Sequence, residues 1–127
     1  MVLAVAAGGA VGSVTRYVVA FAAEHAGFAT SEFPVWTLAI NVSGSFALGF
    51  FSRYFMQSSI APPLLAALTL GFCGGYTTFS TFSYELLGLD ERGLWGRAMV
   101  YAVASVALGL AAVMAGASLG RGLRAGG

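Results

Sequence analysis

The run Gly71–Glu85 reads GFCGGYTTFSTFSYE and combines glycines, hydroxyls and aromatic rings within an otherwise apolar stretch. Adjacent Gly74 and Gly75 in the middle of a membrane helix permit the helix to break. A broken backbone at membrane depth is tolerated only where it is buried in protein or lines a wet cavity or ion site. The freed carbonyls need a partner, which a cation held by backbone oxygens would supply. The alternative is an intact helix in which the glycine pair forms a packing notch.

Two phenylalanines follow the glycine pair. Phe79 and Phe82 lie three residues apart and therefore share one helix face. The edge of an aromatic ring is positive and attracts an anion without a fixed charge. Conduction needs such sites, because an ion must bind well enough to enter and weakly enough to leave. The same spacing is also typical of ordinary packing or lipid contact, so both interpretations stay open.

Polar residues recur in the other apolar segments at one-turn spacing. Thr37 and Asn41 are four residues apart, as are Tyr101 and Ser105. An amide at membrane depth is costly unless it is bonded, and Asn41 would serve equally well between two helices. Arg16 is predicted to snorkel to the interface or to face an aqueous vestibule. Donors on several segments, with no acidic residue near the centre, suit a small anion better than a cation or a proton.

The elements that must position these residues are membrane helices. The chain has 127 residues, of which 58% are apolar and 9% are charged, whereas soluble domains carry about 25% charged residues. The net charge is +1 and there is no lysine, so a nucleic-acid partner is not expected. With one His and one Cys, no catalytic or metal-ligand cluster can be assembled, and an enzyme is not expected either.

The length accommodates four membrane crossings, because a helix needs about 20 residues to cross a hydrocarbon core of about 30 Å. The sequence thus predicts an all-α membrane protein forming one domain over 1–127, with a tail over 120–127 that is frayed. A signal peptide is not expected at the start, since no positive region precedes the first apolar segment and Arg16 interrupts it. The predicted spans are 2–23, 35–56, 62–87 and 94–119.

Small residues spaced four apart let membrane helices approach closely, within or between chains. These pairs are Gly8 and Gly12, Ser45 and Gly49, Gly71 and Gly75, and Gly116 and Gly120.

The distribution of arginines gives no orientation. Cytoplasmic ends of spans normally carry the excess of basic residues. One face of the predicted bundle holds three arginines, and so does the other. Copies inserted both ways could then pair as an antiparallel dimer; the alternative is that one weak determinant sets the orientation. The two sets are Arg53, Arg121 and Arg124, and Arg16, Arg92 and Arg97.

Three motifs resemble the small bacterial and archaeal fluoride channels called Fluc or CrcB, over essentially the whole chain. Trp36 departs from the pattern, since the family often has Gly before the matching Thr. The motifs are Gly8-Gly9-x-x-Gly12-x-x-x-Arg16-Tyr17, Asn41-x-x-Gly44-x-Phe46-x-x-Gly49 and Gly71-Phe72-Cys73-Gly74-Gly75-x-Thr77-Thr78-Phe79-Ser80-Thr81-Phe82.

The resemblance implies a dual-topology antiparallel homodimer in the inner (plasma) membrane, with two pores that export fluoride passively. It also implies a structural sodium ion at the dimer centre, held by the carbonyls of Gly74 and Thr77. Glu85 matches a family position but receives no role. The fluoride pathway would comprise Arg16, Thr37, Asn41, Phe79, Ser80, Thr81, Phe82, Tyr101 and Ser105.

Two alternatives remain. A small proton-coupled multidrug exporter shares the size and span count but needs a carboxylate inside the membrane. Glu24 and Glu32 fall in the first connection, and Glu85 is expected near a helix end. A non-transporting packing subunit would account for the glycines but leaves the run of Thr, Phe and Ser unexplained.

Overall fold

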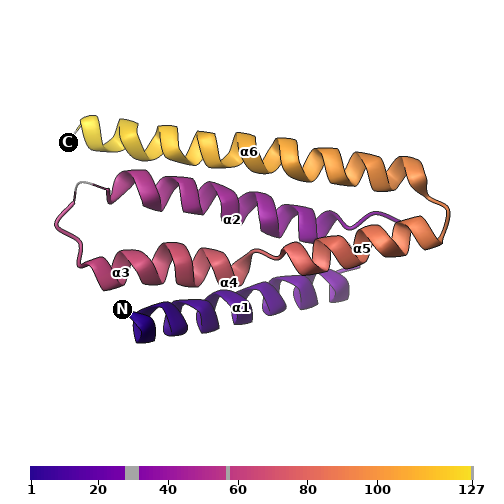
Figure 1. Cartoon of the computed structure of the whole chain (residues 1–127), viewed down its shortest axis with the longest axis horizontal. Helices are drawn as coiled ribbons and strands as arrows, with labels where there is room; N and C mark the ends of the chain where they lie inside the picture. Colours follow the sequence, from indigo (N-terminus) through magenta and orange to yellow (C-terminus); the bar gives the residue numbers. More distant parts are fainter. Residues whose placement is uncertain (28–31, 57, 127) are drawn as a thin grey trace.

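The computed structural model describes residues 1–27, 32–56 and 58–126, and its regular elements there are all helices. The helices run back and forth along the long axis of the molecule (Figure 1). Three of them are long and apolar enough to cross a membrane, which confirms an all-α membrane protein: α1 (Val2–His25), α2 (Val35–Tyr54) and α6 (Trp95–Ala125). The remaining predicted span is interrupted and comprises α3 (Pro62–Ala66), η1 (Ala67–Cys73), α4 (Gly74–Tyr76) and α5 (Phe79–Glu91).

Several helices extend beyond the predicted spans by one or two turns. The connection expected over 88–93 is mostly helical, since α5 continues to Glu91. A turn follows, in which Gly93 has a positive φ of 71° and its N–H bonds the Asp90 carbonyl. The tail expected to be frayed is helical as far as Ala125, because Gly120 packs against the α2 backbone. Parts of the connections expected over 24–34 and 57–63, including Ser31 and Gln57, lie outside the described residues.

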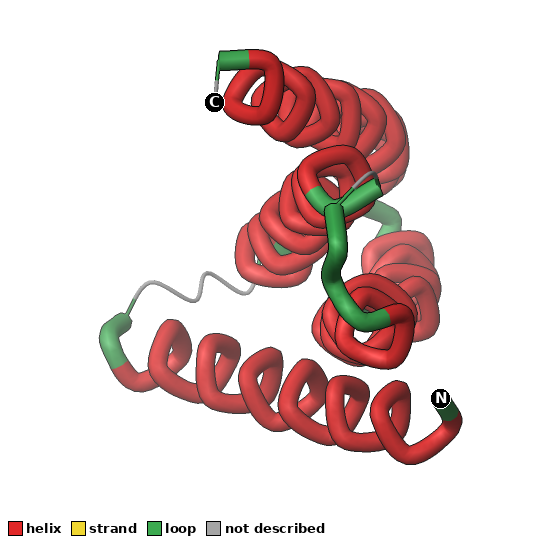
Figure 2. Tube along the Cα trace, turned by 90° about the vertical axis from the view of Figure 1, so that its left-hand side faces the viewer, coloured by secondary structure: helices red, strands yellow, loops and turns green. Residues whose placement is uncertain are grey.

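The small residues join helices within one chain. A Cβ at Gly8 would collide with the Ala67 carbonyl, so the backbones of α1 and η1 are in contact. A Cβ at Gly116 would likewise collide with the Phe46 carbonyl, which ties α6 to α2. The two helix pairs are arranged differently, since α1 lies across the bundle at a marked angle to the other segments (Figure 2).

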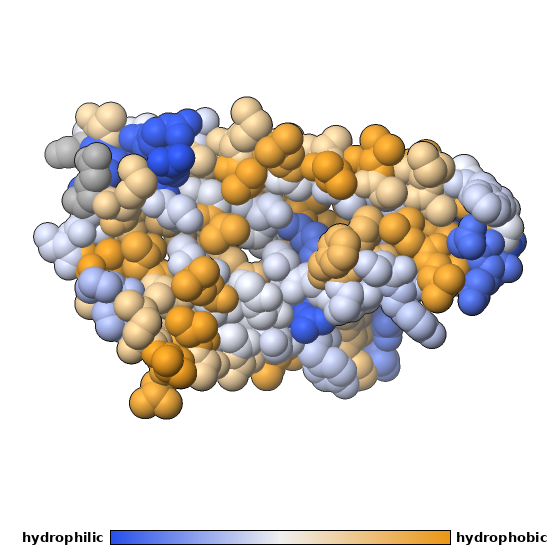
Figure 3. Space-filling model, in the orientation of Figure 1, coloured by the Kyte–Doolittle hydropathy of each residue, from blue (hydrophilic) through white to orange (hydrophobic). Residues whose placement is uncertain are grey.

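A single chain leaves most of its apolar side chains uncovered. Leu3, Leu70 and Phe79 are 85%, 71% and 78% exposed. On the face shown in Figure 3, hydrophobic side chains cover large areas, and the larger hydrophilic patches lie near the two ends. This distribution suits a helix bundle surrounded by lipid, in which close packing rather than hydrophobic burial holds the helices together.

Candidate functional site

The third span is interrupted at Thr77 and Thr78, which join α4 to α5 in an extended conformation (Figure 1). Thr77 has φ −78° and ψ 158°, and Thr78 has φ −149° and ψ 116°. The predicted break is therefore present, but its expected position at the glycine pair is wrong. Gly74 and Gly75 are helical, and Gly75 packs tightly against the α1 backbone. The break falls instead on β-branched threonines, which favour extended backbone.

The helix before the break is also irregular. Residues Ala67–Cys73 form a π-helix, a wide form that is rare and recurs at functional sites. At its end the Cys73 carbonyl accepts both the Thr77 N–H, at 3.0 Å, and the Thr77 hydroxyl, at 2.9 Å. The Thr77 side chain is therefore bonded back onto the preceding helix turn.

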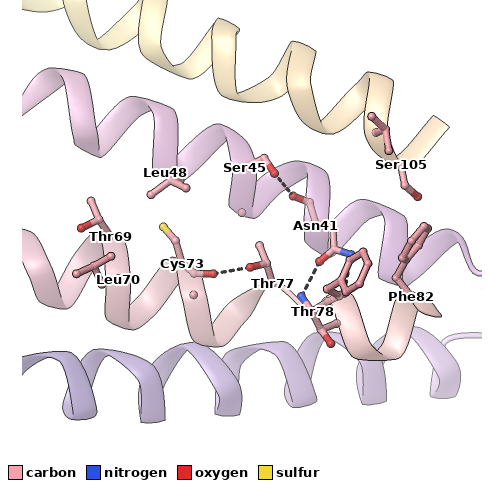
Figure 4. A pocket seen from close by; sticks show the side chains of 14 residues that line it. Asn41, Ser45, Leu48, Thr69, Leu70, Cys73, Thr77, Thr78, Phe82 and Ser105 are labelled. Carbon is pink, nitrogen blue, oxygen red and sulfur yellow. Dashed lines mark hydrogen bonds between the residues drawn. The ribbon is translucent and has the colours of Figure 1, made fainter. Parts of the chain in front are cut away.

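Asn41 of α2 closes the break from one side (Figure 4). Its Oδ1 accepts the Thr78 N–H at 2.7 Å, and its Nδ2 donates to the Thr78 carbonyl at 3.1 Å. The Asn41 amide thus satisfies both the N–H and the carbonyl of Thr78, which have no helical backbone partners in the extended segment. Of the two roles that the sequence left open for Asn41, a bond between helices is the one formed in this chain. An amide N–H can still point elsewhere, since the side chain carries two.

Arg16 of α1 reaches the break from the other side. Its Nε donates to the Gly75 carbonyl at 3.2 Å, and the Ser13 hydroxyl donates to the same oxygen at 3.4 Å. Arg16 also lines a cavity of about 340 Å³ with Thr37, Thr78 and others. Its cationic head therefore lies beside the broken segment rather than at a helix end.

Thr78 begins α5 and gathers the neighbouring hydroxyls. Its Oγ1 accepts the Thr81 N–H at 3.2 Å, which caps the helix. The same hydroxyl donates to the Thr81 Oγ1 at 3.0 Å and lies 3.3 Å from the Ser80 Oγ. The predicted hydroxyl pair, Ser80 and Thr81, is therefore linked through Thr78.

A cavity of about 430 Å³ opens beside the break, and residues of α2, η1, α4, α5 and α6 line it (Figure 4). The rings of Phe79 and Phe82 both line it, with centroids 5.6 Å apart. Ser105 faces it from α6, and its buried Oγ has no hydrogen-bond partner among the described residues. The wall also includes Asn41, Gly74 and Thr77, so six of the predicted site residues line this cavity.

A second polar cluster surrounds Glu85, next to the ring of Phe82. The Thr37 hydroxyl and the Tyr101 hydroxyl each donate to its carboxylate at 2.6 Å. Tyr101 is fully buried, and its ring centroid lies 5.0 Å from that of Phe82. The expectation that Glu85 lies near a helix end is wrong, because α5 continues to Glu91. Thr37 and Tyr101, expected along the pathway, bond this carboxylate rather than facing the cavity of Phe79.

The residues expected to hold sodium are compatible with a cation. No described residue bonds the Gly74 or Thr77 carbonyl across the break. Open space surrounds the position that a Gly74 Cβ would take. Backbone oxygens left without a donor are suitable ligands for a hard cation.

The predicted site residues thus separate into two groups around the break. One group lines the cavity of Phe79 and Ser105, and the other lies near Glu85 or Arg16. Ser80 belongs to neither group and contacts the Thr78 hydroxyl. The sequence reasoning missed the central place of Thr78, although Thr is one of the residue types preferred at a helix N-cap. The partners of Glu85 left no local signal, since they come from other helices.

The fold and the site define a small helical membrane protein with a broken helix and a polar, aromatic-lined cavity. A sequence profile of the family described as "CrcB-like protein, Camphor Resistance (CrcB)" matches residues 3–117, and the chain belongs to this family. Three similar proteins each carry the name fluoride-specific ion channel FluC, which describes a channel and not an enzyme.

These relatives match the chain over nearly its whole length. The protein of Nitrobacter winogradskyi is 44% identical over 124 residues, covering 94% of both chains. That of Bacteroides fragilis is 43% identical over 114 residues, covering 89% of this chain and 90% of its own. That of Chlorobaculum tepidum is 44% identical over 121 residues, covering 94% of both.

Proposed function

We propose that this chain forms a fluoride-selective channel that exports fluoride passively across the inner (plasma) membrane. The observation that carries the proposal is the buried Ser105 hydroxyl, which has no described partner and lines a cavity with Phe79 and Phe82. Fluoride is a small, strong hydrogen-bond acceptor, and a free hydroxyl beside ring edges offers it donors without a fixed charge. The names of the relatives support the same ion.

Conduction in this proposal depends on weak, repeated contacts. Fluoride exchanges its hydration for hydroxyl and amide donors, which include Ser105, Ser80 and the second N–H of Asn41. The edges of Phe79 and Phe82 bridge the stretch between donors. Arg16 draws the anion toward the vestibule without entering the narrow path, because its guanidinium is engaged by the Gly75 carbonyl. Thr81 continues the pathway toward Glu85, and Thr37 and Tyr101 act on it indirectly, since their hydroxyls donate to the Glu85 carboxylate.

The working unit proposed here is an antiparallel homodimer with two pores. A lone chain leaves Phe79 78% exposed at the edge of the cavity, so a second copy would supply the missing wall. The balanced arginines allow both orientations. Adding several lysines after Arg121 is expected to lock one orientation and abolish activity unless an oppositely biased copy is co-expressed. Full activity of the locked chain alone would refute dual topology.

A structural sodium ion at the dimer centre belongs to the same proposal. The carbonyls of Gly74 and Thr77 would hold it, and its charge would stabilise backbone oxygens that the break leaves without donors. Thr77→Ser keeps the carbonyl and should be tolerated. A β-branched residue at Gly74 should damage assembly as well as flux. Equal tolerance of both changes, measured by dimer mass and fluoride efflux, would argue against the ion.

Flux from liposomes tests the function as a whole. Purified protein should release fluoride and retain chloride, and release should stop when the membrane potential is left uncompensated. Glu85 is the one feature that favours a coupled exporter, since its carboxylate lies inside the bundle. Proton movement inseparable from fluoride flux would support that alternative. No flux of either anion would support a non-transporting packing subunit.

A further inference from the structure

The charged side chains are distributed unequally between the two ends of the molecule. Every carboxylate side chain of the sequence belongs to the end of α1, the connection after it, or α5. The opposite end, where α2 and α6 finish, carries Arg53, Arg121 and Arg124. A hydrophilic patch is visible there beside the C-terminus (Figure 3). This end therefore presents a concentration of positive charge with no acidic side chain near it.

The three arginines surround a small cavity, and each donates a hydrogen bond to a neutral group. Arg53 donates to the Met56 sulfur at 3.4 Å, Arg121 to the Ser118 hydroxyl at 3.1 Å, and Arg124 to the Tyr54 carbonyl at 2.8 Å. Arg53 and Arg121 form no ion pair within the described residues. All three line the same cavity of about 280 Å³. A guanidinium group can bind a phosphate through two parallel N–H donors, so several of them around one cavity favour a phosphate there.

An apolar groove continues from this cavity toward the middle of the bundle. It has a volume of about 560 Å³, and Arg53 and Arg121 belong to both spaces. At the floor of the groove, Gly49 brings the α2 backbone into contact with the α6 backbone. The side chains of Leu48 and Met114 beside it are 37% and 61% exposed. Its lining includes Leu48, Gly49, Ser52, Val113, Met114 and Ala117.

The arginines and the groove lie at membrane depths that correspond to the headgroup and the acyl chains of a phospholipid. The 31 residues of α6 extend about 46 Å at 1.5 Å per residue, beyond a hydrocarbon core of about 30 Å. Arg121 and Arg124 in its last turns therefore reach the headgroup layer, and Met114 lies at the level of the acyl chains. We propose that the arginine cluster and the groove bind one anionic phospholipid, with its phosphate on the guanidinium groups and a chain along the groove.

Lipid titration of the purified full-length protein tests this site. Phosphatidylglycerol, phosphatidylcholine with the same chains, and inorganic phosphate are added separately, and bound lipid is counted by native mass spectrometry. Only phosphatidylglycerol should bind tightly and raise the melting temperature. Removing two charges by Arg53→Gln with Arg121→Gln should weaken its affinity about thirtyfold. The matched control, Arg92→Gln with Arg97→Gln, removes the same charge at the other end and should change it less than about threefold.

A second variant tests the groove without touching the charge. Ala117→Phe should obstruct the acyl chain and weaken phosphatidylglycerol binding while leaving the arginines in place. Binding by the parent protein should also weaken with added salt. Equal binding of phosphatidylcholine, or competition by inorganic phosphate at similar concentrations, would overturn the proposal. The proposal would also be overturned if Ala117→Phe lost dimer mass and still bound phosphatidylglycerol as before, because the groove would then be a contact between subunits.

Discussion

Replacing Asn41 with leucine removes the clamp across the break while keeping a side chain of similar size. The amide of Asn41 makes two bonds to the Thr78 backbone, at 2.7 Å and 3.1 Å. Leucine can make neither bond, so the Thr78 N–H and carbonyl lose their partners in a residue that is 9% exposed. The substitution therefore tests whether the break depends on α2.

The expected loss follows from those two groups. A buried donor or acceptor left unsatisfied costs about 1–3 kcal/mol, so the upper range for both is about 6 kcal/mol. Side-chain hydrogen bonds measured inside membranes contribute less, about 0.6 kcal/mol on average, because neighbouring groups rearrange. We therefore expect Asn41→Leu to lower the free energy of unfolding by about 2 kcal/mol.

Unfolding in mixed micelles, followed by circular dichroism, measures this loss, and fluoride efflux is recorded on the same preparations. Ser45→Ala is the matched control, since among the described residues the Ser45 hydroxyl bonds only the Asn41 carbonyl of its own helix, at 2.7 Å, and Ser45 borders the same cavity. It should change the unfolding free energy by less than about 0.5 kcal/mol. Unchanged stability of Asn41→Leu would refute the clamp, and lost efflux with unchanged stability would make Asn41 an ion contact only.

Three further predictions concern other parts of the site and its frame. Phe79→Ile and Phe82→Ile remove the ring quadrupole but not the apolar bulk, so fluoride efflux should fall sharply while dimer mass persists; normal efflux would make the rings packing groups. Gly116→Ala forces a methyl group into the α2 backbone and should cost about 1–3 kcal/mol in the unfolding assay, whereas Gly122→Ala, in open space, should change stability by less than about 1 kcal/mol. Glu85→Gln leaves one acceptor oxygen for two donating hydroxyls and should destabilise the fold by about 1–3 kcal/mol; unaltered unfolding would mean that water replaces the lost acceptor.

The sequence by itself determined the membrane environment, the helical architecture and the irregular third span. Transfer of side chains into hydrocarbon depends on composition and length, which are local properties of the chain. The residue types that can do chemistry were also visible, because glycines, hydroxyls and paired phenylalanines are unusual together in an apolar segment. The family motifs belong to the same level, since they are strings of adjacent residues.

The tertiary structure decided how those residues are connected. The break lies at Thr77 and Thr78 rather than at the glycine pair, because Asn41 bonds the extended backbone there, and the glycines are needed for contact with α1. Glu85 lies inside the bundle, where the hydroxyls of Thr37 and Tyr101, from two other helices, donate to its carboxylate. Partners separated by many residues in the chain leave no local pattern, so only the packing of one helix on another could identify them.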